Sequence, residues 1–228
     1  MTRRISIAAG VVAALALSYF AINGVNGQSE LTSTFNRIYR EGLWGRDAAG
    51  KGVSGTGSTL EITREYRAYL EEFIKTHGVT SIVDAGCGDW NFSSAIDWGG
   101  ASYLGVDIAS DVIHANRTKY EKGKVTFQVG DVTEELPAAD LLISKDVLQH
   151  LSNELVHTFI RNNLKQGKYK WAILTNDRGS GNQDIPSGSY RAIDLSAPPF
   201  EVQGLVDLPI RFGNENKIAS LLDFTQPH

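Results

Sequence analysis

The sequence predicts an α/β fold: an open, mostly parallel sheet of seven strands with helices on both faces. Two observations predict it. Short strand-like runs alternate with amphipathic helical runs along most of the chain, and the run over residues 81–85 is apolar and β-branched, as in a strand covered on both faces. The last two strand-like runs, 201–206 and 217–224, follow each other without a helix between them, which predicts a C-terminal antiparallel hairpin.

The strand over 81–85 leads into a glycine turn. Asp84 stands near its end, and Gly86 and Gly88 follow. Two glycines allow a sharp turn and leave the backbone bare, so that a ligand can lie directly against it. The sequence has no Gly-Lys-Ser/Thr, which excludes a phosphate-binding P-loop, and no complete G-x-G-x-x-G, which disfavours a dinucleotide site.

Length and composition limit the domain organisation, the partners and the kinds of site that the chain can have. The 228 residues suffice for one domain of ordinary size and an appendage, and we divide them into 1–27, 28–59 and 60–228. The net charge is −4 with scattered Lys and Arg, so no nucleic-acid partner is expected. Cys87 is the only cysteine, which excludes an intrachain disulfide and a cysteine-rich zinc site.

The N-terminal part carries an apolar segment. Residues 5–22 contain no charge and follow Arg3 and Arg4. This length is close to the minimum for crossing a bilayer. We expect a single-pass membrane anchor with the arginines on the cytoplasmic side. Two alternatives stay open: a signal peptide cleaved near residues 25–27, with a secreted or secretory-lumen product, and a soluble terminal helix.

Residues 28–59 connect this segment to the α/β domain. Residues 31–41 have the spacing of an amphipathic helix. The glycine-rich stretch 42–58 is either a linker or a flap that folds over a bound cofactor, with Trp44 as a stacking surface.

The α/β domain begins with a predicted helix over 60–77, capped by Ser58 or Thr59 and ended by Gly78. The other expected elements are a short helix-like turn over 91–98, strands over 102–108, 125–130, 139–144 and 170–175, and helices over 110–120 and from about 146.

Acidic residues mark the ends of successive strands. Asp107 lies 23 residues after Asp84, close to the spacing at which an acid meets ribose hydroxyls in nucleotide-binding α/β folds. Asp131 follows the next strand and Asp146 the one after. Because the carboxyl ends of parallel strands meet at one edge of a sheet, these acids are expected to surround one site.

Taken in order, Asp84-x-Gly86-x-Gly88, Asp107 and Gly130-Asp131 resemble the motifs of class I S-adenosylmethionine (SAM) methyltransferases over about residues 60–178. The resemblance implies a Rossmann-like fold with SAM as cofactor. It places the glycines against the methionine and ribose, Asp107 on the ribose hydroxyls, and Asp131 with the Val132 N–H on the adenine. The residues expected to bind SAM are Trp44, Ser58, Asp84, Gly86, Cys87, Gly88, Asp107, Ile108, Asp131, Val132 and Lys145.

More locally, Trp44, the Ser54–Ser58 run, residues 87–90 and residues 145–151 resemble a branch found beside glycan-building enzymes, some of which methylate sugar hydroxyls. Trp90 departs from the superfamily pattern because it occupies the third glycine position of the first motif.

A sugar hydroxyl is a weak nucleophile until a base takes its proton. If a helix begins near Asp146, His150 shares a face with it, and we expect this pair to supply the base. A helix cap and a packed histidine are the structural alternatives. Asn176 and Asp177 could join Asp146 around a divalent cation, although the spacing does not by itself support a metal.

The leading hypothesis is therefore a SAM-dependent O-methyltransferase with a carbohydrate acceptor. Two alternatives remain: the same fold acting on a small molecule, a lipid or a protein side chain, and a non-catalytic binding module. The sequence gives no indication of the oligomeric state.

Overall fold

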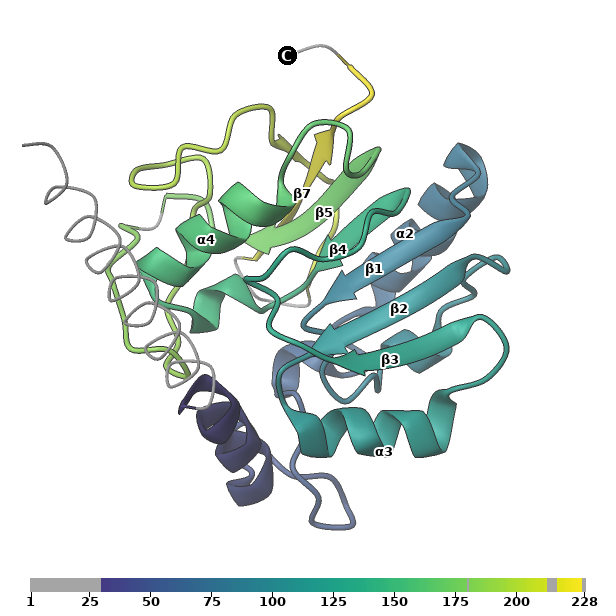
Figure 1. Ribbon diagram of the computed structural model, residues 1–228, viewed down its shortest axis with the longest axis vertical. Coiled ribbons are helices and arrows are strands. Elements are labelled where there is room, and N and C mark those ends of the chain that lie inside the picture. The colour runs from purple at the N-terminus through teal and green to yellow at the C-terminus, as the bar shows by residue number, and fades with distance from the viewer. Residues whose placement is uncertain (1–29, 180, 213–216, 227–228) are drawn as a thin grey trace, which may run out of the picture.

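The computed structural model describes residues 30–179, 181–212 and 217–226. Its sheet has seven strands in the order β3-β2-β1-β4-β5-β7-β6 (Figure 1). β1 to β5 pair in parallel, whereas β7 is antiparallel to both β5 and β6. The predicted fold is confirmed. The strands are β1 (Ser81–Ala85), β2 (Ser102–Asp107), β3 (Val125–Val129), β4 (Leu141–Ser144), β5 (Trp171–Asn176), β6 (Val206–Asp207) and β7 (Ile218–Asp223).

Helices cover both faces of the sheet (Figure 1). β1 shows why: Ile82 packs in one apolar cluster with helix α2, and Val83 packs in the other with helix α4. Successive side chains of a strand point to opposite faces, so a strand buried on both sides is apolar at each position. The helices are residues 30–41, α2 (Arg64–His77), α3 (Ser110–Tyr120) and α4 (Asn153–Asn163), with 3-10 turns η1 (Thr56–Ser58), η2 (Ser93–Ala95) and η3 (Leu148–His150).

Helix α2 ends as predicted and begins later than predicted. Gly78 adopts φ 60°, the left-handed conformation that terminates a helix, and its N–H donates to the Ile74 carbonyl. The expected start at residue 60 is wrong, because α2 starts at Arg64. Thr59 caps only the turn before it, where its Oγ1 accepts from the Ile62 N–H at 3.3 Å.

The strand order places a topological switch point between β1 and β4, where the chain leaves one side of β1 and returns on the other. Open α/β sheets bind ligands in the crevice at the carboxyl ends of the strands beside such a point. Asp84 of β1 and Lys145, which follows β4, lie at this edge.

Two predicted elements differ from the structure. No α-helix begins at Asp146, which has φ 58° and is followed by the single turn η3 and then by α4. The strand expected over 201–206 is reduced to β6, because Glu201 has φ 50° and lies outside the extended region.

Trp90 adopts φ 56°, the backbone conformation that a glycine would take at this position. Its buried indole packs against Tyr103, Tyr120 and Phe127. Aromatic packing therefore holds a non-glycine residue in a conformation that costs roughly 1–2 kcal/mol.

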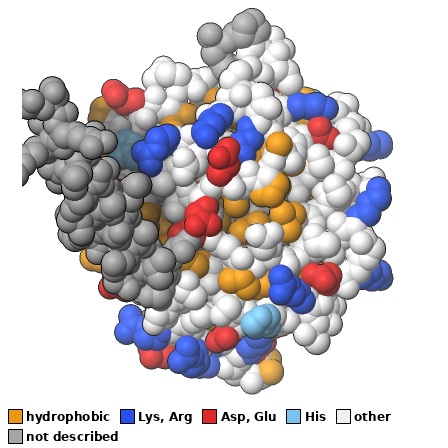
Figure 2. Space-filling view, in the orientation of Figure 1, with side chains coloured by type: hydrophobic (Ala, Val, Ile, Leu, Met, Phe, Trp, Pro, Cys, Tyr) orange, Lys and Arg blue, Asp and Glu red, His pale blue; other side chains and the backbone are white. Residues whose placement is uncertain are grey.

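On the face in Figure 2, acidic and basic side chains are interspersed around a central group of hydrophobic ones. Within the described ranges, no helix has the length and apolar character needed to cross a bilayer. The predicted anchor, residues 5–22, lies outside those ranges.

Candidate functional site

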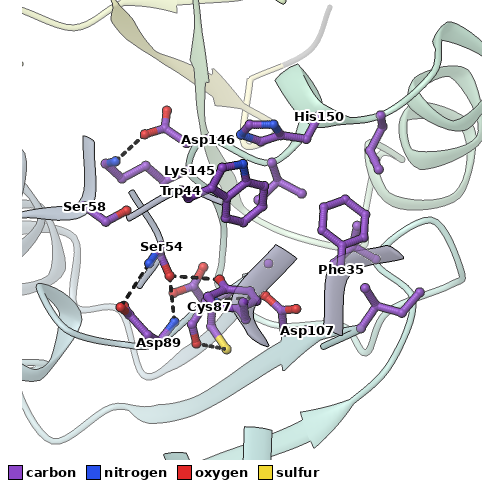
Figure 3. A pocket seen from close by; sticks show the side chains of 18 of the residues that line it. Phe35, Trp44, Ser54, Ser58, Cys87, Asp89, Asp107, Lys145, Asp146 and His150 are labelled. Atoms are coloured by element: carbon purple, nitrogen blue, oxygen red, sulfur yellow. Dashed lines mark hydrogen bonds and ion pairs between the residues drawn. The ribbon is translucent and has the colours of Figure 1, made fainter. Parts of the chain in front are cut away.

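A pocket, partly open to solvent, lies at the carboxyl ends of the strands and is also lined by residues of the helix over 30–41 and of the stretch 42–58 (Figure 3). Both predicted catalytic residues, Asp146 and His150, line it, as do all residues predicted for the cofactor: Trp44, Ser58, Asp84, Gly86, Cys87, Gly88, Asp107, Ile108, Asp131, Val132 and Lys145.

The glycine turn is closely packed on two sides. Gly86 has φ 82°, and a Cβ there would lie 2.2 Å from Cγ2 of Val147. Gly88 has φ 55°, and a Cβ there would lie 2.5 Å from Oγ of Ser54. Both positions therefore need glycine for conformation and for space. The side chain between them, Cys87, is buried, which raises the pKa of its thiol and disfavours a nucleophilic thiolate.

The glycine-rich stretch 42–58 lies over this turn as a flap. The Ser54 N–H donates to Oδ2 of Asp89 at 3.1 Å, and the Asp89 N–H donates to Oγ of Ser54 at 2.9 Å. The Tyr39 hydroxyl lies 2.9 Å from the same Oγ. At the other end of the flap, Nζ of Lys145 donates to the Gly57 carbonyl at 2.8 Å. These bonds tie the flap to the ends of β1 and β4.

Asp107 is positioned by the backbone around it. The Gly88 N–H donates to its Oδ2 at 3.0 Å and the Ala109 N–H to its Oδ1 at 2.9 Å. Burial raises the pKa of Asp107, and these two hydrogen bonds oppose that shift. Asp131 is held by Thr133, whose N–H and hydroxyl both donate to Oδ1. The two carboxylates thus enter the pocket in fixed orientations.

Asp84 is fully buried beside the glycine turn and accepts a short hydrogen bond from the Tyr103 hydroxyl. Burial raises the pKa of Asp84 to about 7, against the lowering effect of that hydrogen bond. A carboxyl group that ionises reluctantly in the free protein gains from a cation placed next to it. The amino group and sulfonium of SAM are cations, so the residues present fit this cofactor.

Asp146 does not pair with His150 in the way that the sequence suggested. Its Oδ2 accepts from Nζ of Lys145 at 2.6 Å and from Nζ of Lys217 at 3.0 Å, and the hydroxyl of Thr175 donates to its Oδ1 at 3.2 Å. Burial would raise the pKa of Asp146, but the two lysines outweigh it and hold the pKa below its ordinary value. Asp146 is thus a stably ionised anchor for two cations and a poor proton acceptor.

The structure gives no support to a divalent cation beside Asp146. Asn176 is buried and turned into the core, where its Nδ2 donates to Oγ of Ser220 at 2.7 Å and its Oδ1 accepts from the Leu195 N–H. Among the described residues, no group of three His, Cys, Asp or Glu side chains could hold a metal ion.

His150 has a defined tautomer. Its Nδ1 lies 2.8 Å from the carbonyl oxygen of Ser189, which can only accept a hydrogen bond, so Nδ1 carries the proton and Nε2 is the basic atom. Its ring lies 4.6 Å from the ring of Trp44 (Figure 3). Burial lowers the pKa of His150, which keeps the imidazole neutral at physiological pH.

Several pocket residues escaped the sequence analysis. Tyr39 lies on the amphipathic face of the helix over 30–41 and could have been found there. Asp89 belongs to the run 87–90 that carries the local resemblance, but its bond with Ser54, which is remote in sequence, could not be read from it. The other unpredicted lining residues are Leu31, Phe35, Ser54, Phe92, Val147 and Leu151.

A family model described as "Methyltransferase domain" matches residues 82–167. No curated protein matches the chain in sequence.

Solved structures share the fold at low identity. The methyltransferase domain of bacterial CtHen1 is 13% identical with a TM-score of 0.53, covering 71% of this chain and 99% of that one. The N-methyltransferase NodS from Bradyrhizobium japonicum WM9, bound to S-adenosylhomocysteine, is 14% identical with a TM-score of 0.53, covering 71% and 87%. Magnesium protoporphyrin IX methyltransferase from Synechocystis PCC 6803 is 16% identical with a TM-score of 0.50, covering 92% and 97%.

The matched segment runs from the second residue of β1 past the end of α4, and so contains the glycine turn, the strand-end acids and His150. With the fold and the pocket, this match to a methyltransferase domain supports SAM-dependent methyltransferase activity.

Proposed function

We propose that this methyltransferase transfers the methyl group to a hydroxyl of a sugar or glycan, with His150 as the general base. The observation that carries the proposal is the fixed tautomer of His150 at the edge of the cofactor pocket. The local resemblance of residues 145–151 and of the flap to sugar-methylating domains supports the acceptor class.

The chain's own residues would hold the cofactor in the pocket. The bare backbone of Gly86 and Gly88 would admit it closely, Asp107 would accept from its ribose hydroxyls, and Asp84 would lie beside its positive charge. When bound, SAM supplies an electrophilic methyl group on a sulfonium. The flap, tied to the pocket through Ser54 and Asp89, would exclude water from it.

His150 would then take the proton of an acceptor hydroxyl at Nε2. Because Nδ1 donates to the Ser189 carbonyl, the ring cannot rotate without losing this bond, and Nε2 stays aimed at one place. The Asp146 charge nearby favours the imidazolium that forms, whereas Lys217 disfavours it. Alignment of the acceptor and removal of its proton are the two tasks left to the protein.

The proposal is tested by incubating the full-length protein with labelled SAM and a panel of acceptors: methyl glycosides, oligosaccharides, phenols, amines, lipid headgroups and peptides. We expect label in the glycosides or oligosaccharides. Label only in another class would replace the sugar acceptor with that class.

A non-catalytic binding module is the alternative from another class. It predicts that SAM binds, as measured by calorimetry, while no acceptor is labelled. The defined base at His150 favours the enzyme, because a module that only binds SAM has no use for an oriented Nε2 atom beside the pocket.

We also propose that residues 5–22 anchor the enzyme in a membrane as a single-pass segment, which would restrict it to acceptors near that surface. Protease protection on sealed membranes tests both the anchoring and the side on which the domain lies. Release of the intact domain into the soluble fraction would instead support signal cleavage.

A further inference from the structure

A second cleft opens beside the cofactor pocket. It shares Trp44, Ser54, Asp146 and His150 with that pocket and extends away from it to Tyr190. Since His150 borders both spaces, a molecule in the second cleft would lie next to this residue. The cleft is therefore in the right place for the group that gives up its proton.

Tyr190 is a large aromatic side chain that is 60% exposed, with its ring 5.7 Å from the ring of His150. Exposed aromatic side chains in a cleft often mark a binding surface. The backbone on both sides of Tyr190 is fixed: the Gly188 N–H donates to the His150 carbonyl at 2.8 Å, and the Arg191 N–H donates to the Gln149 carbonyl at 3.1 Å.

The side chain of Arg191 adds to this anchoring. Its guanidinium donates to the carbonyls of Leu148 and Gln149 and to Oδ1 of Asn153. Together with the bond between His150 and Ser189, these contacts tie the turn that carries Tyr190 to η3. A ligand that stacks on Tyr190 thus meets a surface whose backbone is already ordered, which lowers the entropic cost of binding.

The polar groups of the cleft include both hydrogen-bond donors and acceptors. Asp177 is half-buried; its Oδ2 accepts a 3.3 Å bond from the Ile193 N–H, and its carboxylate also interacts with the Gln149 side chain. Lys217 also lines the cleft, with Nζ bound to Asp146. The carboxylates of Asp146 and Asp177 disfavour a phosphate, and the ammonium group of Lys217 beside them disfavours an amine. Carboxylate and ammonium groups side by side suit hydroxyls, which both donate and accept.

We propose that this second cleft is the acceptor subsite, that the ring of Tyr190 is the platform for one pyranose ring of an uncharged sugar, and that Asp177 and Lys217 bind its hydroxyls. The C–H bonds of a pyranose face carry slight positive charge and pack on the negative face of an aromatic ring. This inference rests on the proposed sugar acceptor, and it adds the residues that recognise the sugar.

The test is saturation-transfer NMR on the full-length protein with S-adenosylhomocysteine present. The probes are the methyl glycosides of glucose, galactose, mannose and rhamnose, with butyl phosphate and butylamine as charged comparisons. We expect glycoside binding that Tyr190→Ala weakens at least tenfold, whereas Tyr190→Phe, which keeps the ring, stays within threefold. Val206→Ala, which truncates another exposed apolar side chain outside the cleft, should have no effect.

The outcomes separate the subsite from the function. Glycoside binding that is unchanged in Tyr190→Ala overturns the platform and leaves a sugar acceptor standing. Binding of butyl phosphate or butylamine in preference to all glycosides, or no glycoside binding at all, overturns the subsite. Whether the enzyme methylates sugars is decided separately, by the acceptor panel with labelled SAM.

Discussion

Nδ1 of His150 lies 2.8 Å from the carbonyl oxygen of Ser189, a residue 39 positions further along the chain. This bond fixes the neutral tautomer and leaves Nε2 as the proton acceptor. The sequence pairs His150 with Asp146, but in the structure two lysines hold that carboxylate. The orientation of the proposed base therefore depends on a backbone carbonyl from a distant loop.

We expect His150→Asn to lower turnover by roughly 10²- to 10⁴-fold with SAM affinity within threefold of the wild type. Asn can keep a donor for the Ser189 carbonyl but has no basic nitrogen. Turnover is measured with labelled SAM and affinity by calorimetry. His114→Ala, on the exposed side of α3, is the control and should change neither quantity. Full activity of His150→Asn would leave His150 with a structural role only.

We expect SAM binding to release a proton from Asp84. The pKa of Asp84 is about 7 in the free protein because the group is buried, so below pH 7 much of it is protonated. A bound cation favours the ionised form, and the proton leaves. SAM affinity should rise with pH up to about 7 and then level off. Calorimetry in two buffers of different ionisation enthalpy measures the released proton directly.

The raised pKa of Asp84 also makes the stability of the folded protein depend on pH. The folded protein keeps a proton on Asp84 between its unfolded pKa of 3.8 and about 7, while the unfolded chain loses it. The free energy of unfolding should therefore fall as pH rises through that range. In Asp84→Asn, the free energy of unfolding should no longer fall over this pH range, and SAM binding should no longer release this proton. A proton release that persists in Asp84→Asn would assign it to another group.

The sheet and the order of its elements could be predicted from the sequence because a strand buried on both faces is a short run of mostly apolar residues, as in β1. The strand-end residues could be predicted because parallel strands bring their ends together. What escaped prediction depends on pairings between distant segments, such as Ser54 with Asp89 and Lys217 with Asp146. The spacing of apolar residues along the chain does not reveal such contacts. The helix expected at Asp146 is wrong for the same reason.

Gly88 and Gly123 offer a matched pair of substitutions. Both have positive φ, 55° and 60°, but a Cβ at Gly88 meets Ser54, whereas at Gly123 nothing lies within 4 Å. Gly123→Ala should lower the free energy of unfolding by about 1 kcal/mol through backbone strain alone. Gly88→Ala should cost roughly 1–3 kcal/mol more because of the clash.

Gly88→Ala should in addition displace the flap, since Ser54 is also bonded to Asp89. We expect SAM affinity to fall at least tenfold in this variant and to stay unchanged in Gly123→Ala. Chemical denaturation and calorimetry measure the two effects. Equal SAM affinity in both variants would separate the flap from cofactor binding.

Lys145 and Lys170 each form an ion pair with an aspartate, and the two pairs differ in burial. Nζ of Lys145 lies 2.6 Å from Asp146 with a side chain that is 3% exposed, and Nζ of Lys170 lies 2.8 Å from Asp140 with a side chain that is 57% exposed. A buried charge that loses a partner is costly, while exposed pairs contribute little. We expect Lys145→Met to lower the free energy of unfolding by roughly 3 kcal/mol and Lys170→Met by less than about 1 kcal/mol.

The pH dependence identifies the cause of the larger loss. The lysines hold the pKa of Asp146 below its ordinary value, so the stability from this pairing is present above pH 3.8 and is lost as pH falls through the folded pKa. In Lys145→Met that acid-induced loss should shrink, because only Lys217 still holds the pKa of Asp146 down. Asp146→Asn should remove the acid-induced loss of this group altogether. An acid-induced loss in Lys145→Met as large as in the wild type would show that Lys145 acts mainly through its contacts with Phe92, Phe212 and the Gly57 carbonyl.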